Sequence, residues 1–200
     1  RQGLRNHHIS REDAIRSFGL DPSKKTILIV GGSLGARTIN NCVMEGLDKI
    51  KTSGAQFIWQ TGKIYIDEAR AAVAQAGELP MLHVTDFISN MAAAYSAADL
   101  IISRAGAGSI SEFCLLQKPV ILVPSPNVAE DHQTKNALAL VDKDAAIYVK
   151  DAEAEERLLP AALDTVKDSD KLKELSNNIA RLALPDSATV IAKEVLKLIK

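Results

Sequence analysis

The chain of 200 residues carries 24 basic and 25 acidic side chains, which leaves a formal net charge of −1. This balance argues against a nucleic-acid partner, because such surfaces need a basic excess on one face. An aromatic content of 4% also leaves few rings for base stacking, whereas 46% apolar residues are enough for the core of one domain.

The two cysteines, Cys42 and Cys114, suggest neither a disulfide framework nor a zinc site. We expect both to be small buried thiols in a reducing compartment. No apolar run approaches the ~18 residues that a bilayer-crossing helix needs, and the opening segment "RQGLRNHHISRED" has no signal-peptide pattern. Because the chain begins with Arg1 instead of methionine, we expect it to be part of a longer protein.

Short β-branched runs alternate with amphipathic stretches along the first three quarters of the chain. The first such helix places Ile39, Val43, Leu47 and Ile50 on one face, and Gly77 is expected to end the second. The expected strands are 26–30, 56–61, 81–87, 99–103, 119–124 and 145–149, and the expected helices are 38–50, 66–77, 88–98, 109–117 and 130–143.

From Asp151 onward the pattern is helical only, and residues 188–199 present one apolar face. We expect this last face to pack on the core in preference to a membrane surface, since its polar side mixes lysines with a glutamate. The whole pattern predicts one α/β domain over 1–200, with C-terminal helices over 153–200. Its fold is expected to be Rossmann-like and doubly wound, with a six-stranded parallel sheet covered by helices on both faces. Ligands of such sheets bind beyond the carboxyl ends of the strands, so the residues there are the candidates for a site.

The first strand is followed by "GGSLGAR", from Gly31 to Arg37. Gly32 and Gly35 would let the backbone approach an anion at the start of a helix, where N–H groups point outward, and Ser33 could add a hydroxyl donor. The stretch is neither a Walker loop nor a strict dinucleotide fingerprint. A purely structural turn is the alternative, and Arg37 has no predicted role.

The third strand is followed by "TDFISNM", in which Phe87 and Ile88 could pack against one face of a flat ligand ring. Exposed backbone at this point could read the edge of the ring. The alternative is that the apolar pair only anchors a buried loop.

The fourth strand is followed by "SRAGAGSISE", a second glycine-rich stretch at a helix start. Glu112 falls in or just past the first turn of that helix. Its carboxylate could accept two hydrogen bonds from a sugar diol, or it could simply complement the helix dipole.

The fifth strand is followed by the most polar segment of the chain, "PSPNVAEDHQTKNA". Acid, amide and imidazole groups suit the hydroxyls of a hexose, although a solvated helix start is the alternative. His132 is not a convincing metal ligand, because no second ligand lies at i+3 or i+4. Together, the four strand ends favour a nucleotide-sugar pocket. The polar side chains of this segment are Asn127, Glu130, Asp131, His132, Gln133, Lys135 and Asn136.

The motifs "VGGSLGAR", "DFISNMAAAYSAADLIISRAGAGSISE" and "KPVILVPSPNVAEDHQTKNA" resemble the C-terminal, donor-binding half of the MurG family of GT-B glycosyltransferases. The resemblance extends from about Thr26 to Lys150, and more loosely to the end. It implies transfer of N-acetylglucosamine from UDP-N-acetylglucosamine to the C4 hydroxyl of lipid I, with inversion at C1 and with neither metal nor other cofactor. It also implies a peripheral location on the cytoplasmic face of the bacterial inner membrane.

The resemblance assigns roles residue by residue. The diphosphate would lie against Ser33 and its neighbours Gly32 and Gly35, beside Ala107 and Gly108. The Ile88 backbone would hold the uracil edge with Phe87 packing nearby, Glu112 would accept the ribose hydroxyls, and Gln133 would bind the sugar. His132 stands where some members carry a glutamine, which leaves Asp131 and Glu130 as competing sugar contacts, and Arg1 would match an arginine that reaches the diphosphate.

In the family, the acceptor site, the lipid-facing loops and the proposed catalytic base lie in an N-terminal half that this chain does not contain. We therefore expect this chain to bind donor without transferring sugar, and lipid I to be bound through that other half. Three alternatives stay open: a stand-alone donor-binding subunit of the dolichol-pathway type, a UDP-N-acetylglucosamine 2-epimerase, and a non-catalytic nucleotide-sugar sensor.

Overall fold

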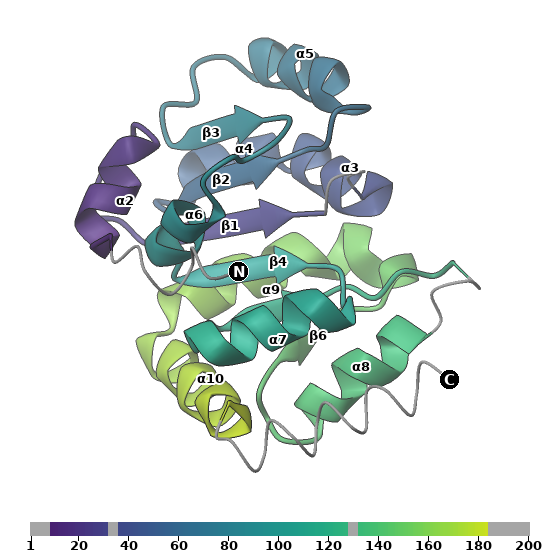
Figure 1. Ribbon diagram of the computed structural model, residues 1–200. Helices are drawn as coiled ribbons and strands as arrows, with labels where there is room; N and C mark the ends of the chain where they lie inside the picture. Colours follow the sequence, from purple (N-terminus) through teal and green to yellow (C-terminus); the bar gives the residue numbers. More distant parts are fainter. Residues whose placement is uncertain (1–8, 32–35, 128–131, 184–200) are drawn as a thin grey trace.

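The computed structural model describes residues 9–31, 36–127 and 132–183, and the helix expected over 188–199 lies outside these ranges. Strands and helices alternate as predicted (Figure 1). The strands are β1 (Thr26–Val30), β2 (Gln56–Gln60), β3 (Leu82–Thr85), β4 (Leu100–Ser103), β5 (Val120–Leu122) and β6 (Ile147–Tyr148). The helices are α2 (Arg11–Ser17), α3 (Arg37–Glu45), α4 (Leu47–Thr52), α5 (Ile66–Ala76), α6 (Met91–Ala97), α7 (Ala107–Leu116), α8 (His132–Val141), the 3-10 turn η2 (Asp151–Glu153), α9 (Ala154–Lys167) and α10 (Ser169–Leu182).

The six strands form one sheet in the order β3-β2-β1-β4-β5-β6, and every neighbouring pair is parallel. The chain first builds outward from β1 to β3 and then returns to β4 on the other side of β1. This is the doubly wound order, which confirms the predicted Rossmann-like fold. The reversal places the switch point of the sheet between β1 and β4.

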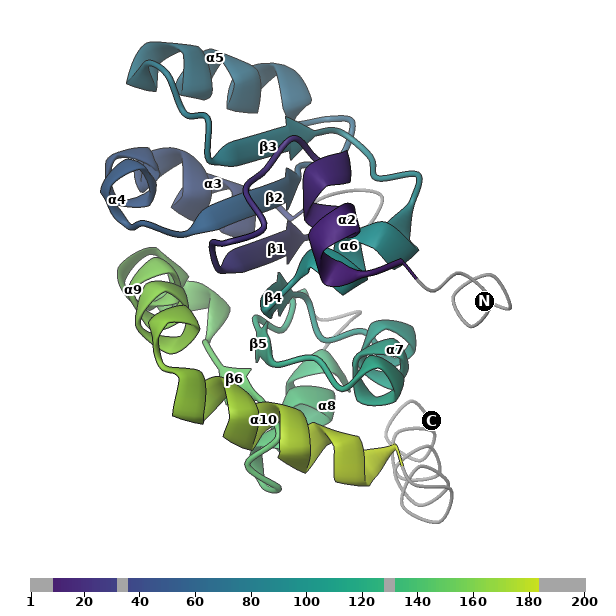
Figure 2. The same cartoon turned by 90° about the vertical axis from the view of Figure 1, so that its left-hand side faces the viewer.

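The core has two layers, because successive residues of a strand point to opposite faces of the sheet. In β1, Leu28 and Val30 pack with α2, α6, α7 and α8, whereas Ile27 and Ile29 pack with α3, α4, α5 and α9. Figure 2 shows these two groups of helices on opposite sides of the sheet. All five residues of β1 and of β2 are buried, as a sheet covered on both faces requires.

The helix predicted over 38–50 is divided at Gly46, so a single helix there was wrong. α3 ends before this glycine and α4 begins after it. A Cβ built on Gly46 would overlap Leu159 Cδ2 of α9, so the glycine allows α9 to pack closely against the bend. The predicted apolar face nevertheless persists across the break, since each of its residues is buried: Ile39, Val43, Leu47 and Ile50.

Helix α2 was not expected from the sequence. Ser10 begins it, and its Oγ accepts the Asp13 N–H at 3.1 Å. Arg11 then donates to both carboxylate oxygens of Asp99, at 3.1 and 2.8 Å, and the same carboxylate accepts the Thr26 N–H at 2.8 Å. These bonds fasten α2 to the amino ends of β1 and β4, at the edge of the sheet opposite the expected site.

Candidate functional site

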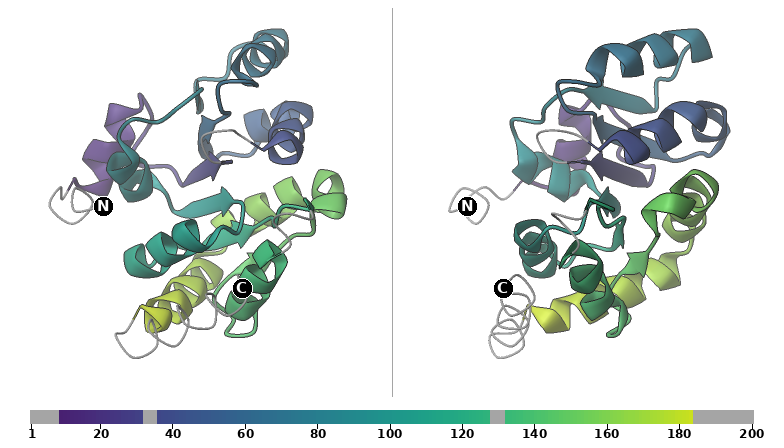
Figure 3. Two further views of the ribbon diagram at one scale, coloured as in Figure 1. Left: turned by 45° about the vertical axis from the view of Figure 1, so that its right-hand side comes forward. Right: turned by 90° about the vertical axis from the view of Figure 1, so that its right-hand side faces the viewer.

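The carboxyl ends of β1 and β4 lie side by side, because Val30 pairs with Ser103 in parallel register. The chain therefore leaves β1 at Gly31 and β4 at Arg104 next to each other. The following helices go to opposite faces, α3 to one and α7 to the other. The right-hand panel of Figure 3 turns this edge of the sheet toward the viewer. The topology thus brings Gly31, where the first glycine-rich stretch begins, next to Arg104 in the second, although the two lie far apart in the chain.

Some of the predicted site residues lie outside the described ranges, and the roles assigned to them stay predictions. They are Arg1, Gly32, Ser33 and Gly35 for the diphosphate, and Glu130 and Asp131 as competing sugar contacts.

The start of α7 lies at the switch point, with backbone donors that the helix itself leaves unpaired. Gly106 is its N-cap, and the first bond along the helix runs from the Ile110 N–H to the Gly106 carbonyl at 3.0 Å. The N–H groups of Ala107, Gly108 and the next residue therefore have no partner inside the helix. A Cβ built on Gly106 meets no heavy atom within 4 Å, and its φ of −69° suits any residue. The fold does not require this glycine, which leaves an open approach to the helix start.

Glu112 lies one turn further along α7 and is half-buried. Its Oε2 accepts a hydrogen bond of 3.0 Å from the hydroxyl of Tyr95, which comes from α6. Burial, together with the charge of Glu112, raises the pKa of Tyr95, so the hydroxyl keeps its proton and acts as the donor. Sequence analysis did not select Tyr95. The single tyrosine in the alanine-rich run "NMAAAYSAAD" was the available signal.

Phe87 and Ile88, which follow β3, take opposite environments. Phe87 is 60% exposed, whereas the Ile88 side chain is 4% exposed and belongs to the core. The Ile88 N–H donates to Gln60 Oε1 at 3.0 Å. Ile88 therefore anchors the loop, as the alternative interpretation expected, while Phe87 presents a ring at the surface, and its contact with a ligand stays a prediction.

Gln133 and Asn136, one turn apart on α8, hold the loop between β4 and α7. Gln133 Oε1 accepts the N–H groups of Ala105, at 3.2 Å, and Ser125, at 2.9 Å. Asn136 Nδ2 donates to the Ala105 carbonyl at 3.1 Å. Both backbone polar groups of Ala105 are thus bound by side chains of α8. His132 is half-exposed at the start of that helix.

Arg104 connects the strand ends to one another, a role that sequence analysis missed. Its Nη1 donates to the carbonyl groups of Val123 and Pro124 after β5 and to Asp151 Oδ1. The other oxygen of Asp151 accepts a bond of 3.2 Å from Thr38 Oγ1 in the first turn of α3. One half-buried ion pair therefore ties together the segments that follow β1, β4 and β5. Arg37, next to this network, is exposed.

Asn40 fastens α3 to the second strand. Its Oδ1 accepts the indole N–H of Trp59 at 2.9 Å, and its Nδ2 donates to the Thr61 carbonyl at 2.9 Å. All three groups are buried. This bond pair fixes the helix that follows the first glycine stretch, and the consecutive asparagines in "TINNC" were the hint to it.

Cys42 and Cys114 are buried and free, and burial raises the pKa of each thiol to about 11. This confirms the prediction of buried thiols. Within residues 9–31, 36–127 and 132–183, no three His, Cys, Asp or Glu side chains gather where they could hold a metal ion. The helices of these same ranges include none that is long and apolar enough to cross a bilayer.

Curated relatives match this chain closely. A protein of Phocaeicola vulgatus named UDP-N-acetylglucosamine--N-acetylmuramyl-(pentapeptide) pyrophosphoryl-undecaprenol N-acetylglucosamine transferase is 86% identical over 198 residues, which cover 99% of this chain and 53% of the relative. A protein of the same name from Bacteroides fragilis is 73% identical over 199 residues, covering 99% of this chain and 52% of its own length. The chain thus spans about half the length of the curated relatives it matches.

A solved structure agrees with these relatives. The crystal structure of MurG from Acinetobacter baumannii superposes with a TM-score of 0.72 at 29% identity, covering 94% of this chain and 53% of that one. The model of the glycosyltransferase family 28 C-terminal domain matches residues 26–191, from the first residue of β1 to beyond α10. The chain therefore belongs to the family of glycosyltransferase family 28 C-terminal domains.

Proposed function

We propose that this chain binds UDP-N-acetylglucosamine as the donor-binding part of an inverting glycosyltransferase. The enzyme transfers N-acetylglucosamine to the C4 hydroxyl of lipid I and so forms lipid II for peptidoglycan synthesis. The relative at 86% identity carries the proposal, because its name specifies both the donor sugar and the acceptor. The doubly wound sheet supports a nucleotide ligand at this edge, because β1 and β4, each followed in the sequence by a glycine-rich stretch, end side by side at its switch point.

In this proposal the diphosphate lies at the start of α7, against the N–H groups of Ala107 and Gly108 and beside the stretch that contains Ser33. The free donors and the positive end of the helix dipole stabilise the charge that develops on the leaving UDP. No acidic residue stands in the first turn of α7 to oppose that charge. The helix start thus supplies the electrostatic part of catalysis that a metal ion supplies elsewhere.

The nucleoside follows along the same edge of the sheet. Glu112 accepts the ribose hydroxyls, and Phe87, exposed at the end of β3, packs on the uracil. Because the Ile88 N–H is bound to Gln60, the uracil edge is held through the Ile88 carbonyl group. The sugar lies near His132 and Gln133 at the start of α8, where the carbonyl oxygen of Gln133 is already bound to the backbone of two loops.

The acceptor is considered separately, because the chain spans only about half the length of the curated relatives. We propose that lipid I, the catalytic base and most of the membrane contact belong to the part of the enzyme that corresponds to the other half of the relatives. The enzyme then acts peripherally on the cytoplasmic face of the inner membrane. This chain alone binds donor and does not transfer sugar. The transferase names of the relatives favour this function over a dolichol-pathway subunit, a 2-epimerase or a sensor.

Calorimetric titration of the chain with UDP-N-acetylglucosamine tests the proposal. We expect uridine-dependent heat, and a loss of about 1.5–3 kcal/mol in Glu112→Ala, which removes an acceptor of charge-assisted hydrogen bonds. Glu156→Ala, an exposed glutamate on α9, is the matched control and should bind like the parent. A parent chain that gives no heat with UDP-N-acetylglucosamine or UDP would overturn the donor site. Product formed from lipid I by the 200-residue chain alone would overturn the proposal that this chain binds donor without transferring sugar.

A further inference from the structure

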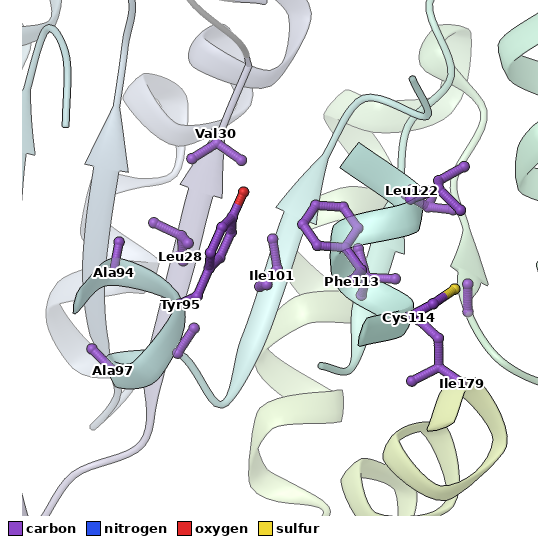
Figure 4. Close-up of a cluster of buried hydrophobic side chains, with 14 of the residues drawn as sticks. Leu28, Val30, Ala94, Tyr95, Ala97, Ile101, Phe113, Cys114, Leu122 and Ile179 are labelled. Carbon is purple, nitrogen blue, oxygen red and sulfur yellow. The ribbon is translucent and has the colours of Figure 1, made fainter. Parts of the chain in front are cut away.

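Tyr95 links α6 to α7 on one face of the sheet, within the core. Its side chain is buried, at 6% exposure, and its ring meets that of Phe113 edge-on with centroids 6.1 Å apart. Figure 4 shows the ring beside Leu28 of β1 and Ile101 of β4, with the hydroxyl oxygen directed toward Val30 at the carboxyl end of β1. The hydroxyl oxygen, the one polar atom of this side chain, thus lies toward the carboxyl edge of the sheet, where the ligand is expected.

That hydroxyl meets the carboxylate of Glu112 at 3.0 Å. In the described part of the chain, no other group makes a hydrogen bond or ion pair to this carboxylate. A carboxylate has two oxygens and about four acceptor positions, so the bond from Tyr95 leaves capacity for a diol. A half-buried glutamate would otherwise populate several rotamers, and one fixed donor on one oxygen selects among them.

We propose that Tyr95 is a positioning residue, whose hydroxyl holds the Glu112 carboxylate in the orientation that accepts the ribose hydroxyls of the donor. The inference rests on the proposed function, because it requires that Glu112 binds the ribose. Tyr95 itself acts through Glu112 and does not touch the nucleotide.

The position of Tyr95 in the chain gives this contact a second consequence. Helix α6 begins three residues after Ile88, whose side chain packs in the same core cluster as Tyr95. The segment proposed to hold the uracil and the helix that carries Glu112 are therefore joined through one rigid ring. If the uracil segment or α7 moved, the distance between the contacts to the base and to the ribose would change. The Tyr95 ring therefore sets the spacing between these two contacts.

Tyr95→Phe removes the hydroxyl and keeps the ring in the core. The probes are UDP and 2′,3′-dideoxy-UDP, which lacks the diol, each titrated into the 200-residue chain. We expect Tyr95→Phe to bind UDP about threefold to tenfold more weakly, a smaller loss than that of a direct hydrogen bond to a charged group, because Tyr95 acts on the ligand only through Glu112. Binding of the dideoxy nucleotide should not change. Tyr148→Phe is the matched control, because this tyrosine packs on the same core cluster from β6.

A double-mutant cycle supplies the second measurement. In a Glu112→Ala background, Tyr95→Phe should have no further effect on UDP affinity, since it has no carboxylate to orient. Equal weakening of UDP and dideoxy-UDP would show a general packing role and overturn the inference, as would unchanged UDP binding in Tyr95→Phe. A parent chain that binds both nucleotides equally well would also overturn it, while leaving a donor site in place. A parent chain that binds neither would remove the proposed function itself.

Discussion

Gly106 offers a direct test of the ligand approach, because the fold gives no reason for a glycine there. Its φ of −69° and ψ of 144° are ordinary for any residue, and an added Cβ meets no heavy atom within 4 Å. Gly106→Ala should therefore leave the protein folded. The loss of unfolded-chain entropy favours alanine by about 0.4–1 kcal/mol, whereas the preference for glycine at an N-cap opposes it by a similar amount. We expect the free energy of unfolding to change by less than about 1 kcal/mol.

The ligand should respond very differently to the same methyl group. A phosphate oxygen bound to the N–H groups of Ala107 and Gly108 would lie about 2.9 Å from each nitrogen, close to the space that the new Cβ enters. We expect at least a tenfold loss of UDP affinity, which is about 1.4 kcal/mol. Gly46→Ala should show the opposite pattern, since its Cβ overlaps Leu159 on the far side of the sheet: it should destabilise the fold and spare the site.

Guanidinium unfolding and calorimetric titration with UDP measure the two quantities on the same samples. If Gly106→Ala binds UDP like the parent, the diphosphate does not approach the start of α7, and the open space at Gly106 does not serve a ligand. If the variant is destabilised by more than about 2 kcal/mol, Gly106 serves the fold and says nothing about a ligand.

Two further predictions concern stability. Asn40→Ala would leave two buried groups without a hydrogen-bond partner, the Trp59 indole N–H and the Thr61 carbonyl. The free energy of unfolding, measured in urea, should fall by about 1–3 kcal/mol for each group. An unchanged urea midpoint would contradict the buried bonds. Burial lowers the pKa of His83, so the unfolded chain takes up a proton that the folded chain resists as the pH falls through about 6.5. The free energy of unfolding should therefore fall as the pH is lowered from about 7.5 to 5.5, and the fall should be shallower in His83→Gln; parallel curves would exclude this origin.

The sheet was predictable from the sequence because its strands are short, apolar on both faces and separated by helical patterns. The run Thr26–Val30 was predicted to the residue, since both of its faces are covered. Strand ends were less well predicted: the expected 119–124 shortened to Val120–Leu122. Pairing ends where the neighbouring strand ends, and that depends on register between segments far apart in the chain.

Elements that depend on tertiary contacts were harder to predict. The break at Gly46 arises from the close approach of α9, a helix more than 100 residues away in the chain, and a single helix was the better local interpretation. Helix α2 is only seven residues long, and its Arg11–Asp99 ion pair joins positions 88 apart. A helix this short is marginal alone, so its local sequence carries little signal.

The candidate site also combines features that the local sequence shows with features that depend on tertiary contacts. Residue types at the strand ends are a local property, so Glu112, Phe87 and the glycine-rich stretches could be selected from sequence. Whether a polar side chain faces a ligand or its own backbone depends on what folds against it. Gln133 has the chemistry of a sugar contact, yet its carbonyl oxygen binds the backbone of two loops, and these bonds exist only because α8 packs beside α7 and the loop that precedes it. Tyr95 shows the reverse case: sequence analysis did not select it, and the fold brings its hydroxyl to the carboxylate of Glu112. For a doubly wound sheet, the sequence indicates which strand ends are candidates for a site, and the packing of the helices decides which polar groups there remain for a ligand.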